Sequence, residues 1–460
     1  MNKLIIFCLA LLSFLSCGNR NPNLSEKQLL ALVTDAVLPE PEVEPTPNLT
    51  TPEGYVPQAG VKYRQKRDLS VPPVRIEILK GIDDVRHVTL SRIAKDIEYV
   101  NIGNHRFGAH VKITPHGLLI SNNDGVWLYS FEGKQIKQIY KNQHGLKIEG
   151  NIVVDRGEPF IGITNLMYDE KDDRLWFQYE NSRETTYLAY MDMREMLLQT
   201  ENRETGQDPV TLLAPFKSGR MSYSRDYIIH KAWNNSMFTT FSFQGDTLCR
   251  FNVGYDSITV KATRGIFVDA GNDYMYRGMY TFRNSFSDTL FRVTAVNKLK
   301  PEYLLDVGTS GRATNRGKKS DVHIDLMYIV QQIKEDDRYL YIKFSKNYDC
   351  PANRSSQKVR FWWGLYDKAK NEFFTLPFIS DSNPDVKGFE NDIDGGIPFW
   401  PTQIGERGEK IAQTFGKQFK EQLSPAWFSQ SKALDSQKKE KLVQFVKTLK
   451  DDDRVIIIVK

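Results

Sequence analysis

The chain has few cysteines and little net charge for its length. Its 460 residues include four cysteines and carry a formal charge of +5. The basic residues are dispersed along the chain, so nucleic-acid binding is not indicated. Cys8 and Cys17 fall in the first twenty residues, which leaves Cys249 and Cys350. These two fit either one disulfide or two separate buried thiols, and only their geometry can decide.

Recognisable catalytic motifs are also missing. We find no nucleophile elbow, no phosphate-binding loop and no dinucleotide fingerprint. After the first twenty residues, no apolar run is long enough to cross a bilayer. These absences favour a soluble body without an obvious catalytic set.

The first residues predict a lipoprotein leader. Lys3 precedes an apolar run from Leu4 to Leu15, which is the pattern of a secretory signal peptide. Leu15-Ser16-Cys17-Gly18 resembles a lipobox, so we expect residues 1–16 to be removed and Cys17 to carry a diacyl lipid. The alternative is an ordinary signal peptide that happens to end near a cysteine. The residues after Cys17 include no acidic pair, which favours an outer-membrane protein that faces the periplasm over a surface-exposed one.

A proline-rich tether follows the predicted anchor. Ser25-Glu26-Lys27-Gln28 has the form of a capping box and precedes a short apolar stretch that predicts a helix. Six prolines between Pro39 and Pro57 exclude helix and central strand there. An extended spacer of this length would reach roughly 60 Å. We therefore assign residues 17–73 to the anchor and tether, and residues 74–460 to the body.

The body has the pattern of an all-β repeat protein. Aromatic residues make up 12% of the chain, and short apolar runs alternate with turns rich in Asp, Asn and Gly. The segments that begin at Asp172, Asp336 and Asp452 resemble one another, and so do those at Asp246 and Asp288. The second pair is 42 residues apart, and the 164 residues from Asp172 to Asp336 are close to four such units. This period predicts a β-propeller with about six to eight blades; the alternative is a pair of β-sandwiches.

The end of the chain predicts helices and a closing strand. Ile411, Phe415, Phe419 and Leu423 recur every four residues, which indicates a helix. A second apolar stripe runs from Leu442 to Leu449 in a Lys-rich segment, and we expect both helices to pack on the body. The apolar run from Arg454 to Lys460 should form a strand that completes the blade begun at the other terminus.

Several segments resemble a family of six-bladed β-propeller lipoproteins of unknown function from gut Gram-negative bacteria of the Bacteroides type. The segments are Leu90–Val100, Trp127–Ile136, Asp288–Arg292 with Lys300–Gly308, and Asn391–Gly396 with Pro398–Pro401. The resemblance covers residues 74–460 and implies six blades with a few peripheral helices near the C-terminus. It departs at Lys141–Lys147, where family members carry a richer glycine stretch. The family implies no catalytic residues.

Two segments are candidate sites. Asn391, Asp392 and Asp394 lie in a turn with two glycines and could ligate a hard cation, for which calcium is the candidate. The alternative, which we favour, is a glycine turn whose aspartates accept hydrogen bonds from local amides. Trp362 and Trp363 could offer a ring to a sugar or peptide, but they point to opposite sides of a strand. We expect one of the two in the core.

The histidines give a weaker signal. His105, His110 and His116 lie near Asp124 in sequence, but their spacing fits no zinc motif. We interpret them as surface or loop residues.

Taken together, the sequence favours a membrane-anchored binding or scaffolding module of the cell envelope. Its partners would be the membrane, through Cys17, and an envelope protein, glycan or peptide on the axial face of the propeller. The alternative is a periplasmic calcium-dependent hydrolase or lactonase with its site in the central channel. A role in envelope glycan uptake is a third reading.

Overall fold

The computed structural model describes most of the chain after residue 60. The described residues are 61–104, 110–122, 125–141, 146–149, 152–155, 162–180, 186–198, 211–216, 219–224, 226–232, 237–252, 272–283, 288–307, 328–346, 360–377 and 388–460. All of them belong to one compact unit, Pro45–Lys460. Among them, no helix is both long and apolar enough to cross a membrane.

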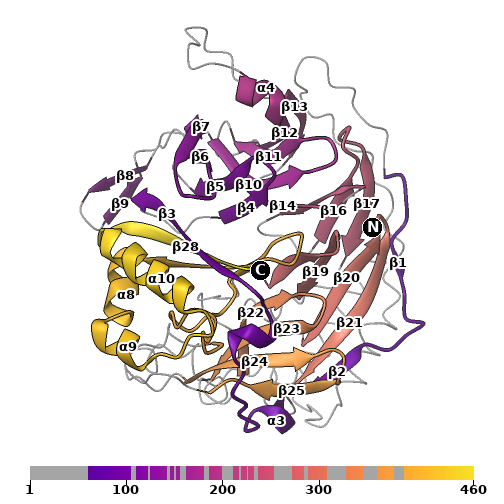
Figure 1. The fold of residues 1–460 in the computed structure, drawn as a ribbon. Coiled ribbons are helices and arrows are strands. Elements are labelled where there is room, and N and C mark those ends of the chain that lie inside the picture. Colours follow the sequence, from indigo (N-terminus) through magenta and orange to yellow (C-terminus); the bar gives the residue numbers. More distant parts are fainter. Residues whose placement is uncertain are drawn as a thin grey trace. The chain divides into compact units, whose positions relative to one another are not determined.

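The unit is a six-bladed β-propeller, as the sequence predicted (Figure 1). Each blade is an antiparallel four-stranded sheet, with its first strand next to the axis.
Blade 1 contains β4 (His110–Thr114), β5 (Gly117–Asn122), β6 (Gly125–Tyr129) and β7 (Gln135–Lys141).
Blade 2 contains β10 (Gly162–Asp169), β11 (Arg174–Glu180), β12 (Thr186–Asp192) and β13 (Thr211–Phe216).
Blade 3 contains β14 (Gly219–Tyr223), β15 (Ile228–Ala232), β16 (Met237–Phe241) and β17 (Thr247–Asn252).

The second half of the ring repeats this order.
Blade 4 contains β18 (Asp273–Tyr276), β19 (Met279–Arg283), β20 (Thr289–Ala295) and β21 (Lys298–Asp306).
Blade 5 contains β22 (Tyr328–Glu335), β23 (Tyr339–Lys346), β24 (Arg360–Asp367) and β25 (Glu372–Thr375).
Blade 6 contains β26 (Gln403–Ile404), β27 (Lys410–Phe415), β28 (Asp453–Val459) and β3 (Ile97–Asn104).
A hairpin of β8 (Leu146–Glu149) and β9 (Ile152–Asp155) lies between blades 1 and 2 in the chain.

Each pair of neighbouring blades shares one apolar cluster. Six such clusters lie between blades, because side chains alternate between the two faces of every strand and each face meets a neighbour. On β28, Val455, Ile457 and Val459 pack toward blade 5, while Ile456 and Ile458 pack toward blade 1. This two-sided burial explains the continuous apolar run at the end of the chain.

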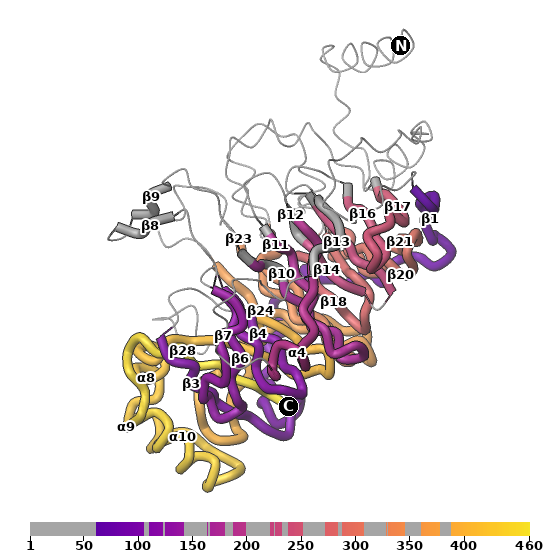
Figure 2. Tube along the Cα trace, turned by 90° about the horizontal axis from the view of Figure 1, so that it is seen from above, coloured from indigo at the N-terminus to yellow at the C-terminus, as the bar shows by residue number. Residues whose placement is uncertain are grey.

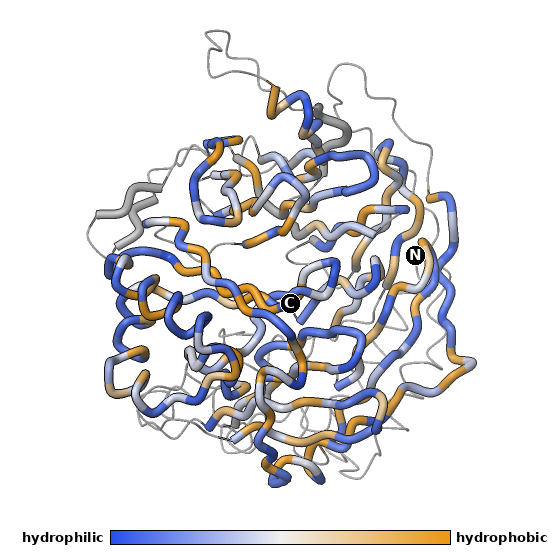
Figure 3. The backbone as a smooth tube through the Cα atoms, in the orientation of Figure 1, coloured by the Kyte–Doolittle hydropathy of each residue, from blue (hydrophilic) through white to orange (hydrophobic). Residues whose placement is uncertain are grey.

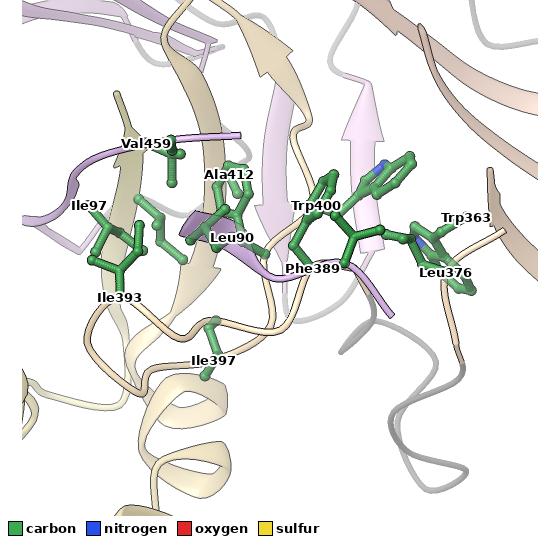
Figure 4. Packing of buried hydrophobic residues seen from close by; sticks show 14 of the residues in the cluster. Leu90, Ile97, Trp363, Leu376, Phe389, Ile393, Ile397, Trp400, Ala412 and Val459 are labelled. Atoms are coloured by element: carbon green, nitrogen blue, oxygen red, sulfur yellow. The ribbon is translucent and has the colours of Figure 1, made fainter. Parts of the chain in front are cut away.

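Blade 6 closes the ring by pairing the last strand of the chain with β3, the strand that comes before blade 1, and the two lie side by side in both views (Figure 1 and Figure 2). β28 pairs antiparallel with β3, from Asp453 opposite Asn104 to Val459 opposite Ile97. The prediction that the last strand completes a blade begun near the N-terminus is therefore confirmed. In the core beside it, Leu90 and Ile97 lie near Ile393, Ala412 and Val459 (Figure 4).

The repeats are real strands, but their predicted alignment is wrong. The segments at Asp172 and Asp336 both lead into the second strand of a blade, in blades 2 and 5. The segment at Asp452 leads into a third strand, and those at Asp246 and Asp288 lead into a fourth and a third strand. The 164 residues therefore span three blades, about 55 residues each, instead of four.

The first of the two predicted C-terminal helices is shorter than expected. Ile411 and Phe415 lie on β27, and α8 begins at Gly416 (Gly416–Gln422), so the four-residue spacing joined a strand to a helix. The second prediction holds: α10 (Ser436–Thr448) begins at Asp435, whose carboxylate accepts hydrogen bonds from the amides of Gln437 and Lys438. A short helix, α9 (Pro425–Gln430), lies between them, and α4 (Met193–Leu198) follows β12.

Residues 61–96 form a segment that we call the N-terminal belt, along the outer edge of blades 3 to 5. It includes β1 (Lys66–Arg67), β2 (Val74–Glu77), α3 (Ile78–Gly81) and a 3-10 turn at Leu90–Arg92. The amide of Tyr63 donates to the carbonyl of Leu248 in blade 3 at 2.7 Å. Both belt strands pair parallel with β21 of blade 4 (Figure 1). The chain thus joins the propeller from about residue 61, ahead of the body boundary expected at Val74.

Candidate binding face

The turns that join the first two strands of each blade lie at one end of the propeller, which we call the hairpin face. All six first strands run in the same direction along the axis, so these turns converge around it. Ion pairs link turns of different blades: His116 with Asp173, Arg277 with Asp337, Lys410 with Asp336. A further pair joins Arg407 of blade 6 to Glu170 of blade 2. The hairpin face therefore carries a charged rim, in which ion pairs link blade 1 with 2, 2 with 6, 4 with 5 and 5 with 6.

Asp173 is the centre of the rim between blades 1 and 2. Its Oδ1 accepts hydrogen bonds from Tyr168 Oη at 2.7 Å and lies 2.8 Å from His116 Nε2. Arg194 Nε lies 3.3 Å from its other oxygen. Burial would raise the pKa of Asp173, but the Tyr168 and His116 contacts outweigh it and hold the pKa below its ordinary value. His116 is thus a turn residue that joins two blades.

A cleft of about 590 Å³ opens on the hairpin face between blades 3 and 4. Its volume lies in the range of small-ligand sites. Both blades and the belt contribute to its lining, which consists of Tyr63, Ser224, Asp226, Tyr227, Ser242, Leu248, Arg277, Gly278, Met279, Thr294, Ala295 and Val296. Tyr63 comes from the belt, so the outer wall of the cleft depends on the segment before β1.

Arg277 brings a cation to this cleft on an unusual backbone. It forms the β18–β19 turn with Gly278, and both residues have positive φ, of 49° and 73°. Such a two-residue hairpin normally carries Asn or Asp at the first position, because other side chains are strained there. Arg277 Nε donates to Asp337 Oδ1 at 2.9 Å, and this pairing raises the pKa of the guanidinium. The turn thus places a fixed cation beside the cleft.

A buried hydroxyl and an exposed carboxylate also line the cleft. Thr294 Oγ1 is buried and has no hydrogen-bond partner among the described residues. A buried hydroxyl in this state loses free energy that a bound polar group or a water would restore. The exposed carboxylate of Asp226 lies on the blade 3 side. The cleft therefore combines aromatic and aliphatic surface with a cation, an acid and hydroxyl groups.

Charged residues on or beside the first strands of several blades lie close enough to influence one another. Lys112 and Lys334 come from the first strands of blades 1 and 5, Asp273 from blade 4, and Glu406 from the β26–β27 turn. Burial lowers the pKa of Lys334, and the charge of Lys112 lowers it further while Asp273 opposes the shift. Desolvation by the surrounding protein raises the pKa of Glu406, whose side chain keeps an exposed surface; Lys112 opposes the shift, and Glu170 and Asp169 add to it. The sequence did not reveal this group of interacting charges.

The turn at Asn391–Gly396 is a clasp between the closing strand and the C-terminal helices. Asp394 Oδ1 accepts from Asn391 Nδ2 at 2.7 Å, from the Gly396 amide at 2.9 Å and from Tyr99 Oη at 3.2 Å. Asp392 accepts instead from the amide and hydroxyl of Ser91. The two carboxylates therefore serve different partners.

Three backbone carbonyls of the clasp also accept hydrogen bonds from the protein. The carbonyls of Asp392, Ile393 and Gly395 accept from the Leu434 amide, the Asp435 amide and Trp427 Nε1. A side chain at position 396 would clash with Tyr99 Oη and Asp394, which explains the second glycine. Within the described residues, no three His, Cys, Asp or Glu side chains converge as a metal site. Calcium at this turn stays a prediction.

A substitution at Asp394 separates the two interpretations. Burial raises the pKa of Asp394 above its ordinary value, although the three donors oppose the shift. The charged form therefore costs stability, and this cost appears as pH rises through the raised pKa. We expect D394N to unfold at the wild-type midpoint near pH 3.5 and above it at pH 7, in urea titrations at both values.

D394A provides the control because it leaves three donors without an acceptor. It should lower the free energy of unfolding by about 2–4 kcal/mol. A calcium-dependent rise in the wild-type midpoint that D394N abolishes would contradict the clasp interpretation.

The other predicted site residues lie apart from the cleft. Trp363 is buried between blades 5 and 6, whereas Trp362 is partly exposed, stacks on Phe344 and packs between blades 4 and 5. The predicted alternation of the two rings is confirmed. His110 is exposed and lies at the opposite end of β4 from His116. His105, Asp124, Cys350 and Cys17 lie outside the described residues.

Cys249 is a free thiol on β17. It is buried in the cluster between blades 3 and 4, and burial raises its pKa to about 12. A thiol in this state is unreactive at neutral pH.

Sequence reasoning missed the cleft, the interacting charges of the first strands and the rim. One signal was present: similar Asp-Asp-Arg triplets begin at Asp172 and Asp336. Both triplets supply rim carboxylates. Charged residues in the short turns of a predicted propeller are therefore candidates for ion pairs between neighbouring blades.

Comparisons with known proteins agree with the fold. The model of a domain of unknown function, DUF4933, matches residues 58–424. A crystal structure of a Bacteroides fragilis protein described as exported is 12% identical, with a TM-score of 0.50, and the match covers 84% of this chain and 99% of that one. No curated protein matches this sequence.

Two further crystal structures are more distant. A member of the DUF4221 family from Bacteroides vulgatus is 11% identical, with a TM-score of 0.36 over 61% of this chain and 84% of that one. Virginiamycin B lyase from Staphylococcus aureus is 10% identical, with a TM-score of 0.32 over 62% and 90%.

Proposed function

Because the chain belongs to the family of the DUF4933 domain, whose function is unknown, we propose a function from its own geometry. The protein is a lipid-anchored, non-enzymatic binding module of the cell envelope, and it binds a saccharide in the cleft between blades 3 and 4. The cleft on the hairpin face is the observation that carries this proposal.

The chemistry of the cleft supports a saccharide. Sugars present an apolar face and a ring of hydroxyls, which match aromatic rings and paired polar groups respectively. Tyr63 supplies an exposed ring, and Asp226, Arg277 and Thr294 supply acceptors and donors. Lys112, Lys334, Asp273 and Glu406, on or beside the first strands of their blades, could add polar contacts for a longer chain of sugars.

A cleft-filling substitution tests the ligand site. A295W should occupy the cleft and reduce affinity for the retained glycan at least tenfold, with the unfolding midpoint nearly unchanged. Screening the wild type on an array of bacterial and host glycans identifies the probe, and calorimetry measures the loss. The control is A369W, which places the same ring on the exposed β24–β25 turn of blade 5. Equal binding by A295W and wild type would contradict the cleft as the site.

The anchor is the second part of the proposal. The apolar run and the Cys17 motif support it, and the B. fragilis protein with the same fold is described as exported. We expect C17A to lose all labelling by a palmitate analogue in cells and to move from the detergent phase to the aqueous phase. C8A, within the leader, should label like wild type. Full labelling of C17A would exclude this anchor.

A further inference from the structure

Exposed apolar side chains gather on the N-terminal belt. Ten large hydrophobic residues of the described chain are exposed, and six of them lie between residues 63 and 85. They are Tyr63, Leu69, Val71, Val74, Leu79 and Val85. Leu69 and Val71, which lie in the joint between β1 and β2, are 63% and 53% exposed. Such a concentration marks an interaction surface more often than a packing fault.

The same segment is basic. Residues 61–80 hold six Lys or Arg against two acids, Asp68 and Glu77, a net charge of +4 on twenty residues. The six basic side chains are all exposed. Asp68 pairs with Lys298 of blade 4 and Glu77 with Lys80, so neither neutralises Lys66 or Arg67. Arg75 also pairs with Asp306 of blade 4, so Lys66 and Arg67 beside the exposed aliphatic residues are the basic side chains that we consider further.

The belt presents these residues at the outer edge of the propeller. β1 and β2 lie outside β21, and the segment between them forms an outer corner on the right of Figure 1. Figure 3 shows a hydrophilic stretch along β1 followed by hydrophobic residues at that corner. Pro72 and Pro73 fix the corner backbone, which keeps Leu69 and Val71 projecting from the body.

We propose that the front of the belt, residues 62–80, docks on an anionic phospholipid bilayer. Exposed aliphatic side chains flanked by Lys and Arg are the chemistry that enters a lipid interface. The belt also follows directly after the segment that the proposed anchor would hold at a membrane. The inference rests on the proposed anchoring only for the presence of a bilayer beside the belt. Docking would turn the outer edges of blades 3 and 4 toward the membrane.

Vesicle sedimentation tests this proposal without the lipid. The chain from Gly18 onward, which lacks Cys17 and the apolar leader, is mixed with vesicles of phosphatidylethanolamine and phosphatidylglycerol, or of phosphatidylcholine alone. We expect binding to the anionic vesicles only, weakened by salt. L69S/V71S should weaken it at least tenfold, and K66Q/R67Q about 25-fold, at about fivefold per charge.

Matched controls alter exposed residues elsewhere on the body. L434S removes an isolated leucine that is 74% exposed, and K441Q/K447Q removes two exposed lysines of α10; both should bind like wild type. Absence of wild-type binding, or equal losses in the controls, would overturn the proposal. Vesicle binding that K66Q/R67Q weakens but L69S/V71S does not would also overturn it. Such a response is purely electrostatic and would point to a nucleic-acid or acidic-protein partner instead. Because the chain carries no lipid, these outcomes are independent of the C17A result.

Discussion

E335A should lower the free energy of unfolding by about 3–5 kcal/mol, because it removes the closest carboxylate partner of the buried Arg292 guanidinium, which would keep only Thr281 Oγ1 and the more distant Glu302. Glu335 is fully buried between blades 4 and 5, and its two oxygens accept four hydrogen bonds. Tyr303 Oη and Lys368 Nζ donate to Oε1 at 3.1 and 2.7 Å, and Tyr274 Oη and Arg292 Nη2 donate to Oε2 at 2.8 and 2.5 Å. Urea unfolding followed by tryptophan fluorescence measures the change.

The control lies two residues away on the same turn. Asp337 pairs with Arg277, but both side chains are more than 60% exposed, so D337A should cost below about 1 kcal/mol. E335Q keeps the shape and one acceptor, and its cost should fall between the two. A loss below 1 kcal/mol for E335A would show that the network does not hold blades 4 and 5 together.

Removal of residues 453–460 should abolish cooperative folding. β28 lies between β27 and β3, and its five residues Val455 to Val459 are buried on both faces. Burying five such side chains stabilises by about 8–15 kcal/mol, which equals the whole stability of a typical domain. Circular dichroism melting and limited proteolysis of the truncated chain measure the loss.

A substitution at the last residue shows whether the effect belongs to the strand. Lys460 forms an exposed ion pair with Glu98, and K460Q removes only that pair. Its melting should match wild type within about 1 °C. A truncated chain that still melts cooperatively would mean that β3 can close the ring on β27 alone.

The sequence predicted those parts of the fold that local pattern controls. Alternation places Trp362 and Trp363 on opposite faces whatever the blade number, and the apolar run at Val455 can only be a strand with two neighbours. The apolar stripe from Leu442 to Leu449 in a Lys-rich segment indicates a helix, which α10 confirms. These features need no knowledge of distant residues.

The missed features depend on pairs far apart in sequence. Arg277 pairs with Asp337 sixty residues later, and the charge of Lys112 in blade 1 lowers the pKa of Lys334 in blade 5. No periodicity reports such contacts. The belt was hidden for a different reason: β1 has two residues and lies in a basic, proline-flanked stretch, so it shows no alternation. The 42-residue period was wrong because the similar turns at Asp246 and Asp288 precede strands at different positions in their blades, the fourth and the third.

The position of the belt has a mechanical consequence. A force applied at the N-terminal side of residue 61 would first load the backbone bonds of Tyr63 to Leu248 and of β1 and β2 to β21. The strand that closes the ring, β3, follows the belt in the chain and would be loaded only after these bonds had broken. If the N-terminal side is anchored as proposed, tension on the chain would reach the belt's bonds to blades 3 and 4 before it reached the β28–β3 pairing that closes the ring.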